Sequence, residues 1–148
     1  MPTKKTAAKE KRQKMPESLR LAKVTPSLTV NNIGRSVAWY RDVLGFTAGE
    51  EWKTDDGKLA GVMLKAGDVE LMLGQDDFAK GRDRIKGVGF RLYCFTRQDV
   101  DARAAQVKSR GGKLDSEPHD ESWGARVFAL TDPDGYRLTI GSTDAPKS

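Results

Sequence analysis

The chain has 148 residues, of which 37% are hydrophobic and 32% are charged, and this is enough apolar material for one hydrophobic core. No apolar run approaches the roughly 20 residues that a membrane-spanning helix needs, and no apolar stretch follows the basic N-terminus as it would in a secretory signal. The single cysteine, Cys94, excludes an internal disulfide, so we expect a cytoplasmic protein without a membrane partner.

The net charge of +5 comes from the first residues of the chain. Residues 1–14 hold six lysines and arginines against one glutamate, so the rest of the chain has no net charge. Because nucleic-acid-binding domains carry positive charge on the folded body, we expect no nucleic-acid partner for this one. Residues 1–22 are predicted to form a disordered basic arm. A weak contact between this arm and nucleic acid or anionic lipid is the alternative.

The first half of the chain predicts a strand, a helix and three further strands. Between Val24 and Val30, apolar residues alternate with serine and threonine, which is typical of a half-buried strand. Asn31 or Asn32 is placed to cap a helix with apolar residues at helical spacing, and Gly45 is placed to end it. The remaining strands of this half are predicted at 50–54, 59–65 and 69–73, and 75–86 is predicted as a polar linker.

The same order of elements returns in the second half. Alternating residues predict a strand from Val88, and Asp99 is placed to cap a helix that ends at Gly111. Further strands are predicted at 114–117, 126–131 and 136–140. A strand-helix-three-strand unit that occurs twice predicts an α+β fold, in which two βαβββ modules form half-barrel sheets around a cleft with the helices outside. The predicted domain spans 23–142, with modules at 23–74 and 87–142 and a tail at 143–148.

Three stretches of the chain carry motifs of one family, namely Pro26–Val30 with Ser36–Phe46, Gly67–Leu73 and Trp123–Tyr136. They resemble the glyoxalase, bleomycin-resistance and extradiol-dioxygenase superfamily, also called the vicinal-oxygen-chelate superfamily. The resemblance covers about residues 23–142 and implies the fold described above. It leaves the activity open, because this superfamily contains isomerases, lyases, dioxygenases and proteins that only bind a ligand.

Metal-using members of the superfamily place four ligands, usually His, Glu or Gln, on the cleft strands. By the resemblance, these positions fall at Thr25, Met72, Gly87 and Thr139. None of these residues, nor their neighbours in the sequence, is a competent ligand for a divalent metal. The resemblance therefore implies the metal-free, bleomycin-resistance-like branch, and we expect no metal and no other cofactor. The only histidine, His119, is predicted to lie in a loop as a surface or packing residue.

Strand parity predicts which side chains face the cleft. The predicted ligand-binding residues are Trp52, Met63, Glu70, Met72, Arg91, Tyr93, Trp123 and Arg137. Aromatic and methionine side chains suit a flat or aromatic ligand, and the charged groups would fix its orientation. Trp123 with Gly124 matches a pair that helps to form the drug groove in metal-free members. Packing of Trp123 on a hydrophobic edge and simple solvation of Glu70 are the alternatives.

The resulting hypothesis is a protein that sequesters a hydrophobic or aromatic small molecule. No nucleophile–base pair is evident, so we expect binding rather than catalysis. Binders of this type are commonly homodimers whose grooves are built by both subunits, and we expect the same here, with closure within one chain as the alternative. A metal-dependent lyase, isomerase or dioxygenase with an unrecognised site, or a protein that acts through its basic arm, are competing hypotheses.

Overall fold

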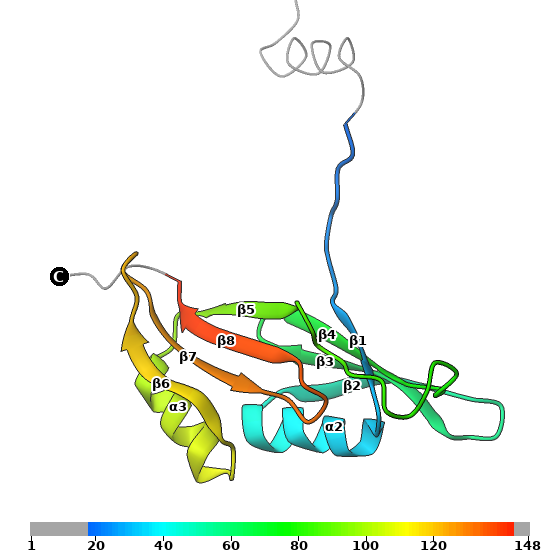
Figure 1. Cartoon of the computed structure of the whole chain (residues 1–148). Helices are drawn as coiled ribbons and strands as arrows, with labels where there is room; N and C mark the ends of the chain where they lie inside the picture. Colours follow the sequence, from blue (N-terminus) through cyan, green and yellow to red (C-terminus); the bar gives the residue numbers. More distant parts are fainter. Residues whose placement is uncertain (1–17, 144–148) are drawn as a thin grey trace, which may run out of the picture.

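The computed structural model describes residues 18–143, so residues 1–17 of the predicted arm and residues 144–148 of the predicted tail lie outside the described part. The chain forms two βαβββ modules in succession (Figure 1). The first contains β1 (Ser27–Val30), α2 (Ile33–Trp39), η1 (Tyr40–Leu44), β2 (Thr47–Lys53), β3 (Leu59–Ala66) and β4 (Val69–Gln75). The second contains β5 (Arg91–Thr96), α3 (Val100–Ser109), β6 (Leu114–Asp120), β7 (Arg126–Thr131) and β8 (Arg137–Ser142).

Each module builds one four-stranded sheet, with strand order β1-β4-β3-β2 in the first and β5-β8-β7-β6 in the second. In both sheets the first strand runs parallel to the last, and the other neighbours are antiparallel. The registers match as well, because Ser27 pairs with Met72 and Tyr93 pairs with Thr139. The predicted α+β fold of two modules is confirmed, and the two sheets of the described chain do not close into one barrel.

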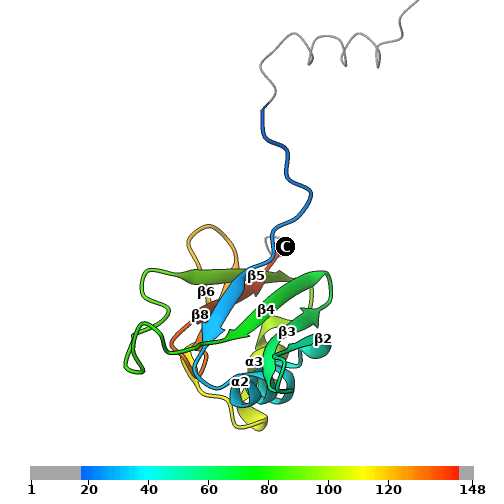
Figure 2. The same cartoon turned by 90° about the vertical axis from the view of Figure 1, so that its right-hand side faces the viewer.

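The helices α2 and α3 lie on the same side of the two sheets (Figures 1 and 2). Alternate strand residues turn toward them, and Leu64, Leu73, Phe128 and Leu130 are completely buried there. These residues belong to one core that runs through both modules, as the alternation of apolar and polar residues requires. We call this the helix side of each sheet and the opposite surface its open face.

The helix ends follow the signals in the sequence. Asn32 caps α2, because its side chain accepts a hydrogen bond from the Arg35 amide at 3.1 Å. The chain continues through the wider turns of η1 and ends at Gly45, whose φ of 90° favours glycine. Asp99 caps α3 in the same way, with the Ala102 amide at 3.0 Å. None of the helices within residues 18–143 has the length and apolar character to cross a bilayer.

Two strands begin later than the alternation predicts. Val24 is 81% exposed and precedes β1, so the prediction of a strand from Val24 is wrong at that end. Val88 is 80% exposed and lies in a turn, closed by the Phe90 amide on the Gly87 carbonyl at 3.3 Å. Gly87 has a φ of 81°, which extended backbone does not allow, so β5 starts only at Arg91.

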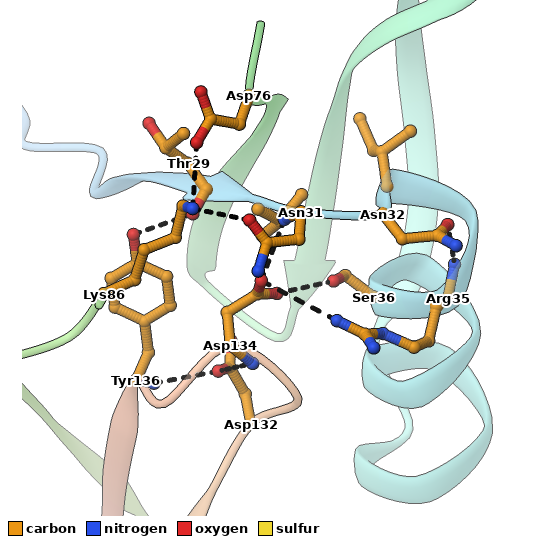
Figure 3. Close-up of polar contacts among 12 residues, drawn as sticks. Thr29, Asn31, Asn32, Arg35, Ser36, Asp76, Lys86, Asp132, Asp134 and Tyr136 are labelled. Atoms are coloured by element: carbon orange, nitrogen blue, oxygen red, sulfur yellow. Dashed lines mark hydrogen bonds and ion pairs between the residues drawn. The ribbon is translucent and has the colours of Figure 1, made fainter. Parts of the chain in front are cut away.

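The turn between β7 and β8 fastens the second module to the first (Figure 3). Its Asp134 carboxylate accepts from the Asn31 amide at 2.8 Å and from the Ser36 hydroxyl at 3.1 Å. Tyr40 donates to the buried Asp132 carboxylate at 2.8 Å. The Asp-Pro-Asp-Gly sequence therefore does more than turn the chain, because its two carboxylates accept hydrogen bonds from Asn31, Ser36 and Tyr40 of the first module.

The predicted polar linker is anchored by a buried ion pair. Lys86 Nζ lies 2.8 Å from Asp76 Oδ2 and 2.5 Å from the Asn31 side-chain oxygen (Figure 3). The lysine side chain is 2% exposed, which composition alone does not predict for a linker. The hydrogen bond from Lys86 lowers the pKa of Asp76, which favours the ionised carboxylate in this pair. It fixes where the second module begins relative to β1.

Candidate functional site

The open face of the first sheet carries four of the predicted ligand-binding residues, three of which are apolar. Met63 and Met72 are register partners on β3 and β4, and both are half-buried. Trp52 lies opposite Gly61, and a Cβ on that glycine would stand 3.1 Å from Cε3 of the indole. The indole therefore lies against the backbone of β3 and remains 38% exposed. The result is a flat apolar surface with two adaptable thioethers beside it.

Glu70 lies at one end of the same face, and it is held by an ion pair. Lys23 Nζ approaches its carboxylate to 2.8 Å, and Lys65 is its register partner on β3. The hydrogen bond from Lys23 lowers the pKa of Glu70. A carboxylate with a lowered pKa is a poor proton acceptor at neutral pH, so the geometry favours a charged, orienting group over a general base.

The open face of the second sheet carries Arg91, Tyr93 and Arg137. The two arginines are register partners on β5 and β8, and both are exposed. The ring of Tyr93 lies 4.7 Å from the ring of Phe95, tilted by 33°. Phe95 is 62% exposed and was missed in the sequence analysis, although it has the same strand parity as Arg91 and Tyr93. An aromatic pair thus adjoins a pair of cations on this face.

Trp123 and His119 lie at the far edge of the second sheet, where β6 turns into β7. Trp123 is 64% exposed in that turn, and β8 and β7 separate β6 from β5, the strand that carries Tyr93. His119 belongs to the end of β6 rather than to a loop, so its predicted placement is wrong. Its ring nitrogens contact the Glu117 carbonyl and the Glu121 carboxylate, both at 2.8 Å. The hydrogen bond to the Glu117 carbonyl raises the pKa of His119 most, and the hydrogen bond to the Glu121 carboxylate raises it further.

The eight predicted residues therefore fall into two groups and one outlier. Trp52, Met63, Glu70 and Met72 share the open face of the first sheet, and Arg91, Tyr93 and Arg137 share that of the second. Trp123 projects from a turn. Their role in ligand binding stays a prediction, and the structure supplies the two surfaces on which it depends.

Comparison with known proteins places this architecture in a family. Residues 20–140 match the model of the glyoxalase/bleomycin resistance protein/dioxygenase superfamily. The chain belongs to this superfamily. It is 28% identical over 121 residues to the uncharacterized protein YraH of Bacillus subtilis, covering 76% of this chain and 91% of YraH. It is 24% identical over 123 residues to a probable lactoylglutathione lyase of Synechocystis, covering 81% of this chain and 94% of the lyase.

Solved structures of the superfamily share the fold at low sequence identity. TioX from Micromonospora sp. ML1 is 18% identical, with a TM-score of 0.67 over 82% of this chain and 98% of TioX. A glyoxalase/bleomycin resistance protein/dioxygenase from Nocardioides is 16% identical, with a TM-score of 0.69 over 96% of this chain and 98% of that protein. At these identities the likeness extends to the fold and to no particular ligand.

The side chains present do not fit the four-ligand metal site of the superfamily. Met72 and Thr139 lie at equivalent positions on the open faces and offer a thioether and a hydroxyl. Gly87 precedes β5, and a Cβ there would stand 2.3 Å from the Gly135 carbonyl oxygen. By the pairing register, Arg91 is the second-module counterpart of Thr25, because they lie two residues before Tyr93 and Ser27 respectively. Within residues 18–143, no three His, Cys, Asp or Glu side chains gather so that they could hold a metal ion.

Proposed function

We propose that this protein is a metal-free, bleomycin-resistance-like binder that sequesters a hydrophobic or aromatic small molecule in the cytoplasm. The observation that carries the proposal is the composition of the open faces. Trp52, Tyr93 and Phe95 are each more than a third exposed there, Trp52 on β2 and the other two on β5. Exposed apolar patches mark binding surfaces, whereas single exposed apolar residues are ordinary, so the Tyr93–Phe95 pair and the surface of Trp52 with two methionines both favour ligand binding.

The binding cleft is formed, in this proposal, by a homodimer. The open faces of one chain are not closed into a barrel, so each needs a partner surface to surround a ligand. A second copy would bring the Tyr93 and Phe95 face of one subunit over the Trp52 face of the other, which gives two equivalent grooves. Within each groove, the aromatic rings and methionines contact the flat body of the ligand, and Arg91 with Arg137 orients a polar group.

The oligomeric state is tested by analytical ultracentrifugation of the full chain. We expect twice the 16.3 kDa of one chain. Phe95→Ser is expected to shift the protein toward monomer, because it places a hydroxyl in the proposed interface. Ile85→Ser is the matched control, because Ile85 is 80% exposed and lies in the loop between the modules. A wild-type monomer at all concentrations would remove the dimer groove from the proposal.

Ligand capture is tested with the neutral aromatic dye N-phenyl-1-naphthylamine, whose emission rises in apolar sites. Trp52→Ala and Tyr93→Ala are each expected to weaken dye binding by about tenfold, because each removes one aromatic wall. Ile85→Ala is expected to change nothing. Equal affinity in all four proteins would show that the open faces do not bind aromatic compounds.

The second candidate function is a metal-dependent lyase, isomerase or dioxygenase, and the lyase name of the Synechocystis relative favours it. Elemental analysis separates the two. The protein is incubated with zinc, nickel, cobalt, manganese or ferrous iron and then desalted. The binder proposal expects less than about a tenth of an equivalent of each metal, because the donor set is poor. Close to one equivalent per chain or per dimer would make the metal-dependent enzyme the better description.

A further inference from the structure

A separate hollow lies on the helix side of the second sheet, where the two modules meet. Its volume is about 830 Å³, which falls within the range of about 300–1,000 Å³ that small-molecule pockets occupy. The wall from the first module is formed by the end of η1 and the turn between β3 and β4. The wall from the second module is formed by α3 and β5. None of the eight predicted ligand-binding residues lines it.

The floor of the hollow is apolar. Phe128 and Leu138 are buried beneath it at 0% and 1% exposure, and Val43 and Ile140, which are half-buried, present apolar surface to the hollow. The hollow exists because α3 packs against β6, β7, β8 and η1 and leaves the helix side of β5 partly uncovered, with Leu92 and Cys94 half-buried. An apolar floor of this kind favours the hydrocarbon or aromatic part of a ligand.

The rim of the hollow is cationic. Three arginines line it, Arg97 before α3 and Arg103 and Arg110 on and just after that helix, against the single carboxylate of Asp68. Within residues 18–143, none of the three arginines has a carboxylate within 4.0 Å. Three cations against the one carboxylate of the lining leave a net positive site.

Arg103 shows the imbalance most clearly. Its Nε is the one buried side-chain nitrogen or oxygen in the described part of the chain that makes no hydrogen bond. A buried donor without a partner destabilises the folded state unless something else satisfies the group. The guanidinium offers several N–H groups in a rigid plane, which suits a carboxylate, sulfonate or phosphate.

We propose that this hollow is a second ligand site, which takes a small amphipathic anion. The apolar body of the ligand lies against the half-buried side chains of Val43, Cys94 and Ile140, and its acidic group is bound by Arg103 and Arg110. The site is distinct from the open faces in its residues, because Arg103 and Arg110 bind the acidic group here and Arg91 and Arg137 do not line the hollow. The site requires only one chain, because both of its walls come from the same subunit.

The probe is 8-anilinonaphthalene-1-sulfonate, which joins an aromatic body to a sulfonate. We expect it to bind the full-length protein with one site per chain. Arg103→Met keeps most of the apolar stem and removes the charge, so it is expected to raise the dissociation constant about tenfold, and Arg110→Met is expected to act in the same direction. Arg82→Met is the matched control, because Arg82 is an exposed arginine over the ring of Phe78 and does not line the hollow.

The only cysteine provides an independent readout, because Cys94 lines the same hollow. Burial raises the pKa of its thiol, so alkylation by iodoacetamide is followed at mildly alkaline pH. Saturating sulfonate dye is expected to slow alkylation of Cys94 severalfold in the wild type and to lose this effect in Arg103→Met. The neutral dye N-phenyl-1-naphthylamine is expected to protect less well, because it has no group for the arginines.

Three results would overturn the proposal. They are absence of dye binding, affinities in Arg103→Met and Arg110→Met within twofold of the wild type, and alkylation of Cys94 that bound dye does not slow. If Arg137→Met weakens the sulfonate dye while Arg103→Met does not, the dye occupies an open face. The hollow would then carry no anion site, and the proposal for the open faces would stand.

Discussion

Replacing Tyr40 by phenylalanine removes one oxygen atom from the interior and leaves the packing of the ring unchanged. Tyr40 is completely buried, and its hydroxyl donates to Asp132 Oδ2 at 2.8 Å. Asp132 is 4% exposed and also accepts from the amides of Asp134 and Tyr136. A hydrogen bond to a charged acceptor contributes about 1.5–3 kcal/mol, so we expect Tyr40→Phe to lower the free energy of unfolding by about 2 kcal/mol at neutral pH. The midpoint of thermal unfolding would fall by roughly 5–8 °C.

The deficit is expected to depend on pH with a definite sign. Burial raises the pKa of Asp132 above its ordinary value, and the hydrogen bond from Tyr40 opposes that rise. A group whose pKa is raised by folding favours the folded state when it is protonated, and this contribution is lost as pH rises through the folded pKa. Without Tyr40 the pKa of Asp132 is higher still, so the deficit of Tyr40→Phe grows as pH rises from about 4 and shrinks on acidification.

Urea unfolding followed by circular dichroism between about pH 4 and pH 8 measures both quantities. Tyr136→Phe is the matched control, because its hydroxyl donates to the uncharged carbonyl of Thr29, also at 2.8 Å. It is expected to lose about 0.5–1.5 kcal/mol at every pH in this range. A loss below about 0.5 kcal/mol for Tyr40→Phe at pH 7, or the same loss at pH 4 and pH 8, would refute the reasoning.

Three further predictions concern stability. Gly87→Ala is expected to lower the free energy of unfolding in urea by at least about 1–3 kcal/mol, because the φ of Gly87 is 81° and the new Cβ would meet backbone. Gly67→Ala should lower it less, because a Cβ at Gly67 has open space, and equal losses would contradict this. The hydrogen bond from Arg126 lowers the pKa of Asp101, so this ion pair stabilises the folded state above the ordinary carboxyl pKa and stops doing so as pH falls. In thermal scans from pH 6 to pH 3, the unfolding midpoint of Arg126→Met should therefore fall less than that of the wild type. Leu73→Ala, at a completely buried site, should lower the free energy of unfolding by about 2–5 kcal/mol. A loss of less than about 1 kcal/mol would mean that Leu73 does not pack in the core.

Local patterns predict the elements well because their causes are local. The caps Asn32 and Asp99 accept hydrogen bonds from amides three residues ahead, as their chemistry requires. Alternation separates the two faces of β4, where Leu71 and Leu73 are buried and Met72 is half-buried, because strand geometry alone turns successive side chains to opposite faces. It does not describe β7, where parity places Val127 and Ala129 on the open face but both are buried like Phe128 between them. It failed at Val88, because Gly87 and Gly89 on either side have positive φ and the strand begins only at Arg91.

The parts that sequence reasoning missed depend on contacts between distant residues. The burial of Lys86 follows from its contacts with Asp76 and Asn31, and no local signal distinguishes it from a solvated linker lysine. The exposure of Phe95 was within reach, because its parity with Tyr93 already placed it on the open face. The hollow beside α3 depends on the angle at which two modules meet, which periodicity does not determine.

The carboxylates of the last hairpin have a consequence for the order of folding during synthesis. They accept from Asn31, Ser36 and Tyr40, which precede them by 103, 98 and 92 residues. When the first module leaves the ribosome, these donors have only water, and a buried tyrosine hydroxyl has no acceptor until Asp132 has been made. The first βαβββ unit is therefore completed by the end of the chain, and fragments that stop before the final hairpin should remain loosely packed around their first helix.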